Sequence, residues 1–268
     1  MELKDLYQKN REAKKATGQY NVYNYEMIKG VTMAAKEKNT PVLIGTSPHG
    51  VKLIGMDEIN SIVNFYKERL DVPIFINLDH GREVDTVKKA IDLGYDGVHF
   101  DGSELDFEDN IQKTKEIVSY AKDKDVLIEG EIELIGSETM TDPEKAAQFV
   151  KETNINSLAV NIGNRHGIAD SGTNPSLKIE RLIEIAQKIP EIYLVLHGGS
   201  GTPVEDLKKA ISKGIVKVNF ATELKNTYVS ALQAVVENNS GSDILYNGHR
   251  EGFKAIKAKV EEKFKLLS

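Results

Sequence analysis

The sequence predicts a single (β/α)8 barrel that spans residues 1–268. Short runs rich in β-branched residues alternate with longer amphipathic segments, which is typical of repeated strand–helix units around a parallel sheet. The chain has 268 residues, close to the ~250 that such a barrel commonly has. No stretch rich in proline, glycine and serine divides the chain, so we expect one domain.

Eight segments have the length and composition of strands. They are residues 19–22, 41–44, 73–78, 97–100, 126–131, 157–162, 192–196 and 215–220. Other segments carry apolar residues at helical spacing, namely residues 25–38, 57–69, 83–93, 110–122, 142–151, 178–188 and 204–213. Asp57, Asp142 and Pro203 stand at predicted helix starts, and Gly94 and Gly214 follow predicted helix ends.

The two ends of the chain are predicted to be helical as well. Residues 1–20 are charged and helical in character, without the apolar segment of a secretory signal. Residues 237–247 are predicted to form a loop. From about Gly248 we expect one charged amphipathic helix that packs on the barrel or on a partner subunit.

Composition excludes several classes of function. The absence of cysteine excludes disulfides, thiolate metal sites and cysteine nucleophiles, so a metal ion must be held by His, Asp or Glu. The 35 Lys and Arg are scattered among 41 Asp and Glu, and the net charge is −6, which argues against nucleic acid as a partner. No segment is long and apolar enough to cross a membrane, so we expect a soluble, cytoplasmic protein.

In a barrel of this kind the active site lies at the carboxyl ends of the strands. Three of the six histidines, His80, His166 and His197, directly follow apolar strands at this rim. A lone histidine is more often a hydrogen-bonded or surface residue, but three at equivalent positions favour a Zn²⁺ site with one open position for substrate. We expect His99, inside a strand, to be a satisfied core residue, and His49 and His249 to be exposed.

Two loops at the same rim are candidates for phosphate binding. Residues 196–203 contain three glycines before a predicted helix, so backbone N–H groups there can approach a phosphate. A tight strand–helix turn would have the same glycines. However, this loop follows the seventh strand and residues 219–222 follow the eighth, which is where barrels recurrently bind phosphate. A metal beside a phosphate site indicates chemistry on a phosphorylated sugar.

Six motifs closely resemble those of the class II, metal-dependent fructose-bisphosphate aldolase family. They are LDHG (78–81), DGS (101–103), IEGEIE (128–133), IGNRHG (162–167), LHGGSG (196–201) and KVNFATELK (217–225). The resemblance runs from about residue 18 to about residue 225, in the order of the family. The last motif is most similar to the tagatose-bisphosphate aldolase branch, which has Ala at the position of Ala221 where many fructose-specific members have Asp. The sequence therefore leaves the sugar open.

The resemblance implies a role for each site residue. His80, His166 and His197 would bind one Zn²⁺ per subunit, with Asp101 and Glu131 as neighbouring or alternative metal positions. Asp79 would be the acid/base for the aldehyde oxygen. The dihydroxyacetone phosphate part would be bound by residues of the rim loops, with Asn21 and Ser47 lining the pocket; the loop residues are Gly167, Gly198, Gly199, Ser200, Asn219, Ala221 and Thr222. The family also binds a monovalent cation, near Gly167 and Gly198, and forms homodimers or homotetramers.

The reaction implied is the reversible cleavage of a ketose 1,6-bisphosphate to dihydroxyacetone phosphate and glyceraldehyde 3-phosphate, a reaction of glycolysis and related carbohydrate metabolism. Zn²⁺ would stabilise the enediolate as a Lewis acid. A carboxylate at a strand end, Asp79, can accept the hydroxyl proton. The alternative role for Asp79 is to orient a histidine ligand, and both roles are compatible.

One segment departs from the family pattern. The family has a glycine-rich loop of the form GxxGGxED after the fifth strand, whereas residues 130–145 read GEIELIGSETMTDPEK. Glu133 replaces a glycine, Gly136-Ser137 replaces Gly-Gly, and Thr139-Met140 stands where Glu-Asp is common. Glu138 is the nearest candidate for the residue that exchanges the carbon-bound proton. The alternative is that Glu138 is a solvated loop acid.

Two other functions remain open at this point. Lys217 alternates with Asn219 on one face of a strand, which would suit a Schiff-base aldolase. A lysine there is more often a packing residue paired with an acid, and this hypothesis leaves the three rim histidines unexplained. The altered loop after the fifth strand suggests instead a phosphosugar-binding protein that has lost catalysis.

Overall fold

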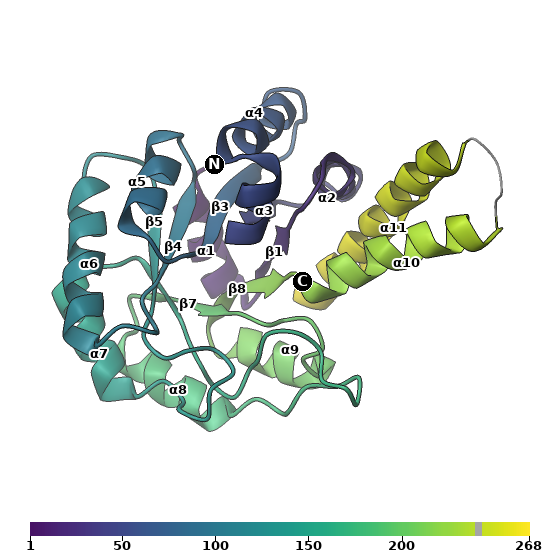
Figure 1. The fold of residues 1–268 in the computed structure, drawn as a ribbon. Coiled ribbons are helices and arrows are strands. Elements are labelled where there is room, and N and C mark those ends of the chain that lie inside the picture. Colours follow the sequence, from purple (N-terminus) through teal and green to yellow (C-terminus); the bar gives the residue numbers. More distant parts are fainter. Residues whose placement is uncertain (239–242) are drawn as a thin grey trace.

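The computed structural model describes residues 1–238 and 243–268, and it confirms the predicted TIM barrel. Eight parallel strands pair in chain order, and β1 closes the barrel against β8 (Figure 1). The strands are β1 (Thr17–Asn21), β2 (Val42–Thr46), β3 (Ile74–Gly81), β4 (Gly97–Asp101), β5 (Leu127–Glu131), β6 (Ser157–Ala159), β7 (Tyr193–Leu196) and β8 (Ile215–Phe220).

Helices follow the strands and surround the barrel. They are α1 (Leu3–Ala13), α2 (Tyr25–Lys38), α3 (Pro48–Ile54), α4 (Met56–Lys67), α5 (Val84–Asp92), α6 (Phe107–Tyr120), α7 (Pro143–Thr153), α8 (Ile179–Lys188), α9 (Val204–Ser212), α10 (Thr222–Asn238) and α11 (Ile244–Leu267). The main apolar core lies between the strands and these helices. Within the described ranges, none of the helices is long and apolar enough to cross a membrane.

Helix α1 closes the amino-terminal mouth of the barrel. Its buried residues Leu3, Leu6 and Tyr7 form a second apolar cluster with side chains from the strands, Leu43, Phe75, Leu127, Tyr193 and Val216. The rings of Tyr7 and Tyr193 meet edge to face, with centroids 5.5 Å apart. Because this mouth is filled, the opposite rim is the open end of the barrel.

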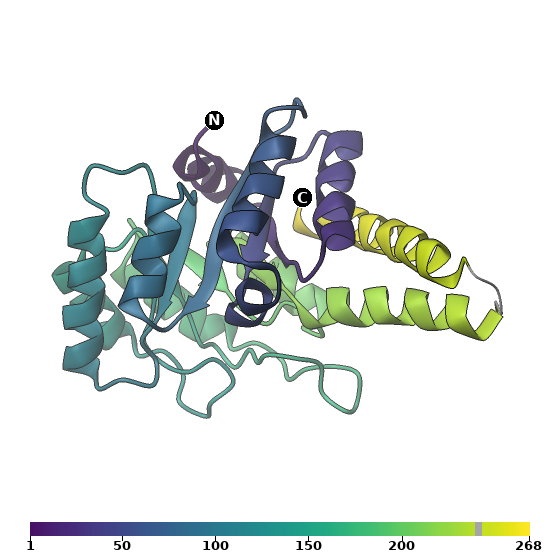
Figure 2. The ribbon, with the colours of Figure 1, turned by 45° about the horizontal axis from the view of Figure 1, so that its top comes forward.

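Helices α10 and α11 form an antiparallel pair that projects beyond the barrel (Figures 1 and 2). At its base α11 packs closely against α2, where a Cβ on Gly30 would lie 2.7 Å from Ile256 Cγ2. The predicted C-terminal helix is confirmed, but it begins at Ile244, one turn before Gly248. The predicted loop 237–247 is therefore wrong at both ends, and its middle, 239–242, lies outside the described residues.

Two helices were not predicted. Helix α3 begins where Ser47 caps it, accepting a hydrogen bond from the backbone N–H of Gly50 at 3.3 Å, and Pro48 occupies the first turn. Helix α10 continues directly from the phosphate-loop candidate after β8. Among the predicted caps, Asp142 accepts bonds from Glu144 and Lys145 as expected, whereas Asp57 lies inside the first turn of α4.

Two strands have an end three residues away from the predicted one, whereas the ends of the other strands lie within two residues of the prediction. Strand β6 ends at Ala159 and not at residue 162, because side chains replace the sheet partners there. The Asn164 side chain accepts from the Ile162 N–H at 2.8 Å, and the Asn161 side chain accepts from the Gly163 N–H at 3.1 Å. Strand β3 runs beyond residue 78 to Gly81, with a register shift against β4 between Leu78 and Gly81.

Candidate active site

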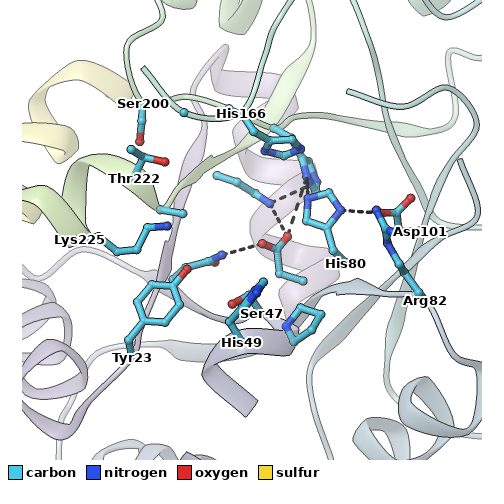
Figure 3. A pocket seen from close by; sticks show the side chains of 18 of the residues that line it. Tyr23, Ser47, His49, His80, Arg82, Asp101, His166, Ser200, Thr222 and Lys225 are labelled. Carbon is cyan, nitrogen blue, oxygen red and sulfur yellow. Dashed lines mark hydrogen bonds and ion pairs between the residues drawn. The ribbon is translucent and has the colours of Figure 1, made fainter. Parts of the chain in front are cut away.

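A cavity of about 580 Å³ opens at the carboxyl ends of the strands. Most of the predicted site residues line it, from seven of the strand ends: Asn21, Ser47, Asp79, His80, Asp101, His166, Gly167, His197, Gly198, Ser200, Asn219, Ala221 and Thr222. Figure 3 shows Ser200, Thr222 and Lys225 on one side of His80, and Arg82 with Asp101 on the other. Most of the residues predicted from the sequence therefore meet at one cavity.

Three predicted site residues do not line this cavity. Glu131 is fully buried behind it, 3.9 Å from His80 Nδ1. Gly199 is packed beneath the loop against Val218 and Phe220. Glu138 is exposed and lines a neighbouring cavity between the β5–α7 and β6–α8 loops, to which His166 also contributes.

The rings of His80 and His197 meet at the centre of the site. His80 Nδ1 lies 2.9 Å from Asp101 Oδ2, and His197 Nε2 lies 2.7 Å from Glu129 Oε1. A carboxylate accepts only, so each of these ring nitrogens donates its proton. The remaining nitrogens, His80 Nε2 and His197 Nδ1, face each other at 3.0 Å. Two imidazole lone pairs thus converge on one point, which requires either a shared proton or a cation between them.

Charge at this pair is unevenly distributed. Burial lowers the pKa of His80, but the carboxylates of Asp79, Asp101 and Glu131 outweigh burial and raise it to about 9. Burial and the positive charge of His80 hold the pKa of His197 well below its usual value. Both shifts favour protonation of His80 before His197.

His166 stands at the edge of the pair. Its ring centroid lies 4.9 Å from that of His80 and 6.1 Å from that of His197, so the three predicted ligands are brought together. Unlike the other two, His166 has an exposed side chain at the rim. The part of its ring that is turned toward the site is desolvated, and this desolvation and the charge of His80 lower its pKa, which favours the neutral form that a metal ion needs.

Asp79 is held by amide groups on both oxygens. Asn21 Nδ2 donates to Oδ2 at 2.7 Å, and Asn219 Nδ2 donates to Oδ1 at 2.9 Å. Burial raises the pKa of Asp79, but the positive charges of His80 and Lys217 nearby outweigh burial, so the net shift of this pKa is downward. Asp79 is consequently an ionised carboxylate with a fixed orientation beside the histidine pair.

Beneath the site, the barrel interior is polar where such barrels are commonly filled by Val, Ile and Leu. Lys217 is fully buried, and its Nζ lies 2.6 Å from Glu129 Oε2 and 3.1 Å from Gln19 Oε1. The other oxygen of Glu129 holds His197. Lys217 is thus paired with an acid, as expected for a packing lysine, and it does not line the cavity.

The expectation for His99 is wrong in part. It is fully buried, as predicted, but among the described residues its Nε2 has no hydrogen-bond partner. Its ring packs against those of His80 and His197, with centroids 4.8 Å from each. In the sequence nothing distinguishes His99 from an ordinary core residue, because it lies inside a strand and not at its end. His49 is exposed as predicted, whereas His249 is half-buried and bonded to Tyr228.

The two candidate phosphate loops lie side by side. Gly198 has φ +71°, and a Cβ added there would collide with the carbonyl oxygen of Arg165, so no larger residue fits. Ser200 Oγ accepts from the Glu223 N–H at 3.1 Å, which joins this loop to the start of α10. Asn174 Nδ2 donates to the carbonyls of Gly167 and Ser200, both at 2.9 Å. Asn174 was missed by the sequence analysis, because it follows no strand.

Other lining residues were also missed, among them Tyr23, Pro48, His49, Arg82, Leu134 and Lys225. Several of these residues lie within a few residues of a strand end, so their place in the sequence was enough to identify them as candidates. Arg82 is engaged by acids, with Nη1 2.8 Å from Glu104 and Nε 3.4 Å from Asp101. Lys225 has no ion pair with any described residue, and its Nζ lies 5.5 Å from the ring centroid of Tyr23.

The residues present fit a divalent metal ion. Two groups of side chains have ligand atoms within 4.8 Å of one another: Asp79, His80, His99 and His197, and His80, Asp101 and Glu131. Each central histidine is backed by a carboxylate, which fixes its tautomer and directs a lone pair inward, the arrangement found behind metal-binding histidines.

Comparison with known proteins agrees with this geometry. The profile of the family described as "Fructose-bisphosphate aldolase class-II" matches residues 1–268. A sulfofructosephosphate aldolase of Alkalicoccus urumqiensis is 32% identical over 261 residues, covering 93% of this chain and 90% of that protein. Escherichia coli YdjI, described as an uncharacterized protein, is 35% identical over 262 residues, covering 94% and 91%.

Solved structures give the same result. The crystal structure of the YdjI aldolase from Escherichia coli superposes with a TM-score of 0.88 and 31% identity, covering 100% of this chain and 96% of that one. A fructose-1,6-bisphosphate aldolase homologue from Coccidioides immitis has a TM-score of 0.88 and 28% identity, covering 98% and 94%. The chain therefore belongs to the class II fructose-bisphosphate aldolase family, and it is a carbon–carbon lyase.

Proposed function

We propose that this class II aldolase is metal-dependent and reversibly cleaves a ketose 1,6-bisphosphate to dihydroxyacetone phosphate and glyceraldehyde 3-phosphate. One observation carries the proposal: His80 Nε2 and His197 Nδ1 converge at 3.0 Å, each backed by a carboxylate, directly beside the ionised Asp79. Such a pair is suited to a cation, and a neighbouring carboxylate is suited to move a proton.

His80, His166 and His197 would hold the ion, and we propose Zn²⁺, one per subunit, because imidazole nitrogen is a ligand that Zn²⁺ favours. The ion would act as a Lewis acid that stabilises negative charge on the carbonyl and hydroxyl oxygens of the three-carbon fragment. Asp101 and Glu131 lie close enough to His80 to be alternative ligands. We also place a monovalent cation near Gly167 and Gly198, where backbone carbonyls gather around Asn174.

Two residues of the chain are proposed for the two proton transfers of the reaction. Asp79 accepts the proton of the hydroxyl on C4 as the C3–C4 bond breaks, and the electron pair of that bond remains on C3. Asn21 and Asn219 keep Asp79 oriented during this step. C3 must then receive a proton to give dihydroxyacetone phosphate. We propose Glu138 for this transfer, which requires the segment 132–141 to bring it from the neighbouring cavity into the main one.

The loops after β7 and β8 would bind the phosphate of dihydroxyacetone phosphate. Gly167, Gly198, Ser200 and Thr222 line that side of the cavity, and the Ser200 hydroxyl is fixed at the start of α10. Asn21, Ser47 and Ala221 line the remaining wall. Gly199 contributes by letting the loop pack onto β8.

The proposed reaction is tested by adding fructose and tagatose 1,6-bisphosphates to the purified protein. We expect cleavage that EDTA abolishes and Zn²⁺ restores, and the ratio of the two rates identifies the sugar. Sulfofructose phosphate belongs in the same assay, because the relative of that name matches almost the whole chain. Cleavage indifferent to EDTA would contradict the metal proposal, and phosphosugar binding without cleavage of any substrate would favour the binding-protein alternative.

Lys225 supplies a second prediction about the substrate. It is the cavity-lining lysine, and no described acid pairs with it. If it binds an anionic group of the substrate, Lys225→Met should raise KM roughly tenfold, the lower range for a charge-assisted hydrogen bond at an exposed site, with little change in kcat. The measurement is steady-state kinetics with Lys208→Met as a control on the surface of α9. An unchanged KM would exclude Lys225 from substrate binding.

We further propose that the enzyme acts in cytoplasmic carbohydrate metabolism, as in glycolysis, and forms a homodimer or homotetramer. The oligomer is supported by exposed apolar side chains on the projecting pair of helices α10 and α11, namely Val229, Val236, Leu245 and Tyr246. Apolar groups exposed on such an extension are suited to contact between subunits.

A further inference from the structure

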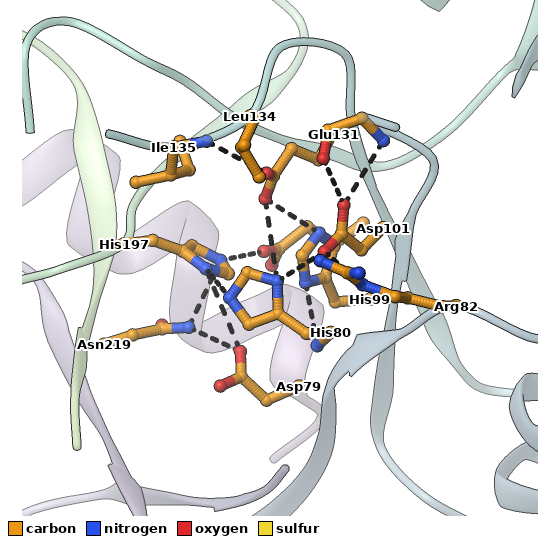
Figure 4. Close-up of polar contacts among 12 residues, drawn as sticks. Asp79, His80, Arg82, His99, Asp101, Glu131, Leu134, Ile135, His197 and Asn219 are labelled. Carbon is orange, nitrogen blue, oxygen red and sulfur yellow. Dashed lines mark hydrogen bonds and ion pairs between the residues drawn. The ribbon is translucent and has the colours of Figure 1, made fainter. Parts of the chain in front are cut away.

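His99 bridges two groups of the site that come from different strands. It lies on β4 with no exposed surface, and its Nδ1 is 3.1 Å from the backbone nitrogen of His80 on β3. Its Nε2 is 3.4 Å from Glu131 Oε2 on β5. Figure 4 shows His99 next to His80 and Asp101, on the inner side of the site.

The first of these contacts fixes the tautomer of His99. A backbone N–H can only donate, so Nδ1 must accept from His80. A neutral imidazole has one lone pair and one N–H, and therefore Nε2 carries the proton. A protonated Nε2 cannot bind a metal ion. His99 is thus excluded as a ligand in this arrangement, although it lies among the ligand candidates. Its Nε2 lies 3.4 Å from Glu131 Oε2, an oxygen that accepts no hydrogen bond from the described residues.

The second reason to assign a role to His99 is the backbone of His80. His80 has φ +54°, a left-handed conformation that is uncommon for a residue other than glycine. It lies in the register shift between Leu78 and Gly81, where neither Asp79 nor His80 is paired with a residue of β4. The imidazole of His99 accepts the N–H of His80 there. Such conformations persist only where the surrounding structure holds them.

We propose that His99 is a positioning residue: its Nδ1 holds the left-handed backbone from which His80 points its Nε2 at His197, and its Nε2–H restrains Glu131. The inference rests on the proposed function only in that His80 is taken as a metal ligand. The contact between His99 and the His80 backbone involves no metal ion and can be tested separately.

Three substitutions separate this role from packing. Asparagine places an acceptor near the position of Nδ1, glutamine places a polar group near Nε2 only, and leucine provides neither. We expect hydrogen exchange of the His80 amide in the metal-free protein, followed by NMR, to be at least roughly tenfold faster in His99→Leu and His99→Gln than in the wild type. His99→Asn should keep the slow exchange.

Metal affinity is the second readout, measured by competition with a chelating dye. We expect the Kd for Zn²⁺ to rise about 10–100-fold in His99→Leu and His99→Gln, the usual effect of losing a group that orients a ligand, and to rise much less in His99→Asn. Equal losses in all three variants, or none in any, would overturn the proposal. A wild type that binds no Zn²⁺ would contradict the proposed metal site, while the amide exchange would still test His99.

The wild-type protein provides a further check that needs no variant. The imidazole nitrogens of His99 should give the NMR pattern of the neutral Nε2–H tautomer. The Nδ1–H tautomer would overturn the proposal, because Nδ1 could then accept nothing from His80.

Discussion

Replacing Asp79 by asparagine is expected to lower kcat for cleavage by roughly 10²–10⁴-fold, the range for losing a positioned acid or base. Asparagine has the shape of the carboxylate but cannot take the C4 hydroxyl proton. It should be tolerated structurally, because Asn219 Oδ1 has no described partner and a rotation of that amide would turn an acceptor toward the new NH2 group. The measurement is the steady-state rate of retro-aldol cleavage in the Zn²⁺-loaded variant.

Proton exchange separates the role of Asp79 from that of Glu138. Dihydroxyacetone phosphate alone exchanges a proton of its hydroxymethyl carbon, which corresponds to C3 of the ketose, with deuterated water if a base acts on that carbon. We expect Asp79→Asn to keep this exchange while losing cleavage, and Glu138→Gln to lose the exchange. Cleavage by Asp79→Asn at a rate near that of the wild type would reduce Asp79 to a residue that orients its histidine neighbours.

The strand ends explain why so much of the site could be predicted from the sequence. In a parallel barrel, the last residue of each strand and the first of its loop lie at one rim, so LDHG, DGS and LHGGSG had to meet once the strands were placed. His80, Asp101, Ser200 and Asn219 all line one cavity for this reason. The neighbours of each strand in the barrel follow from chain order alone, because each strand pairs with the next one in the sequence.

The contacts of the inward-facing residues within the strands could not be predicted in the same way. His99 and Lys217 were expected to be inside the barrel, but one sequence does not indicate which groups, such as Glu129, they contact there. Their pairing depends on the stagger of strands far apart in the chain, such as the 2.6 Å contact of Lys217 with Glu129 across the barrel. Helix α10 was missed for another reason: its apolar residues pack mainly on α11 and not on the sheet.

The second large effect is a loss of stability, and we expect it on substitution of the buried Lys217. Lys217→Met leaves Glu129 as an unpaired charge inside the barrel, since Glu129 Oε2 has its 2.6 Å contact with Lys217. Removing one partner of a buried pair costs about 3–5 kcal/mol of the free energy of unfolding. For a chain of this size that corresponds to a Tm lower by roughly 6–20 °C. Thermal unfolding followed by circular dichroism measures it.

A double variant supplies the control, because it removes the unpaired charge. In Lys217→Met with Glu129→Gln, the glutamine oxygen still accepts from His197 Nε2, where Glu129 Oε1 now lies at 2.7 Å. Most of the lost stability should therefore return, since a neutral pair avoids the desolvation of an isolated charge. If Lys217→Met alone unfolds at the wild-type temperature, the pair is not a stabilising contact.

The same variants decide between the metal mechanism and a Schiff base on Lys217. A Schiff base requires the lysine amine to attack the substrate carbonyl, and borohydride would then trap a covalent adduct and inactivate the wild-type enzyme. Because Lys217 is fully buried, paired with Glu129 and absent from the cavity wall, we expect no adduct and no inactivation. The double variant, assayed with Zn²⁺ below its Tm, should still cleave the substrate. A trapped adduct on the wild-type enzyme, together with a double variant that is folded but inactive, would instead support a Schiff-base mechanism on Lys217.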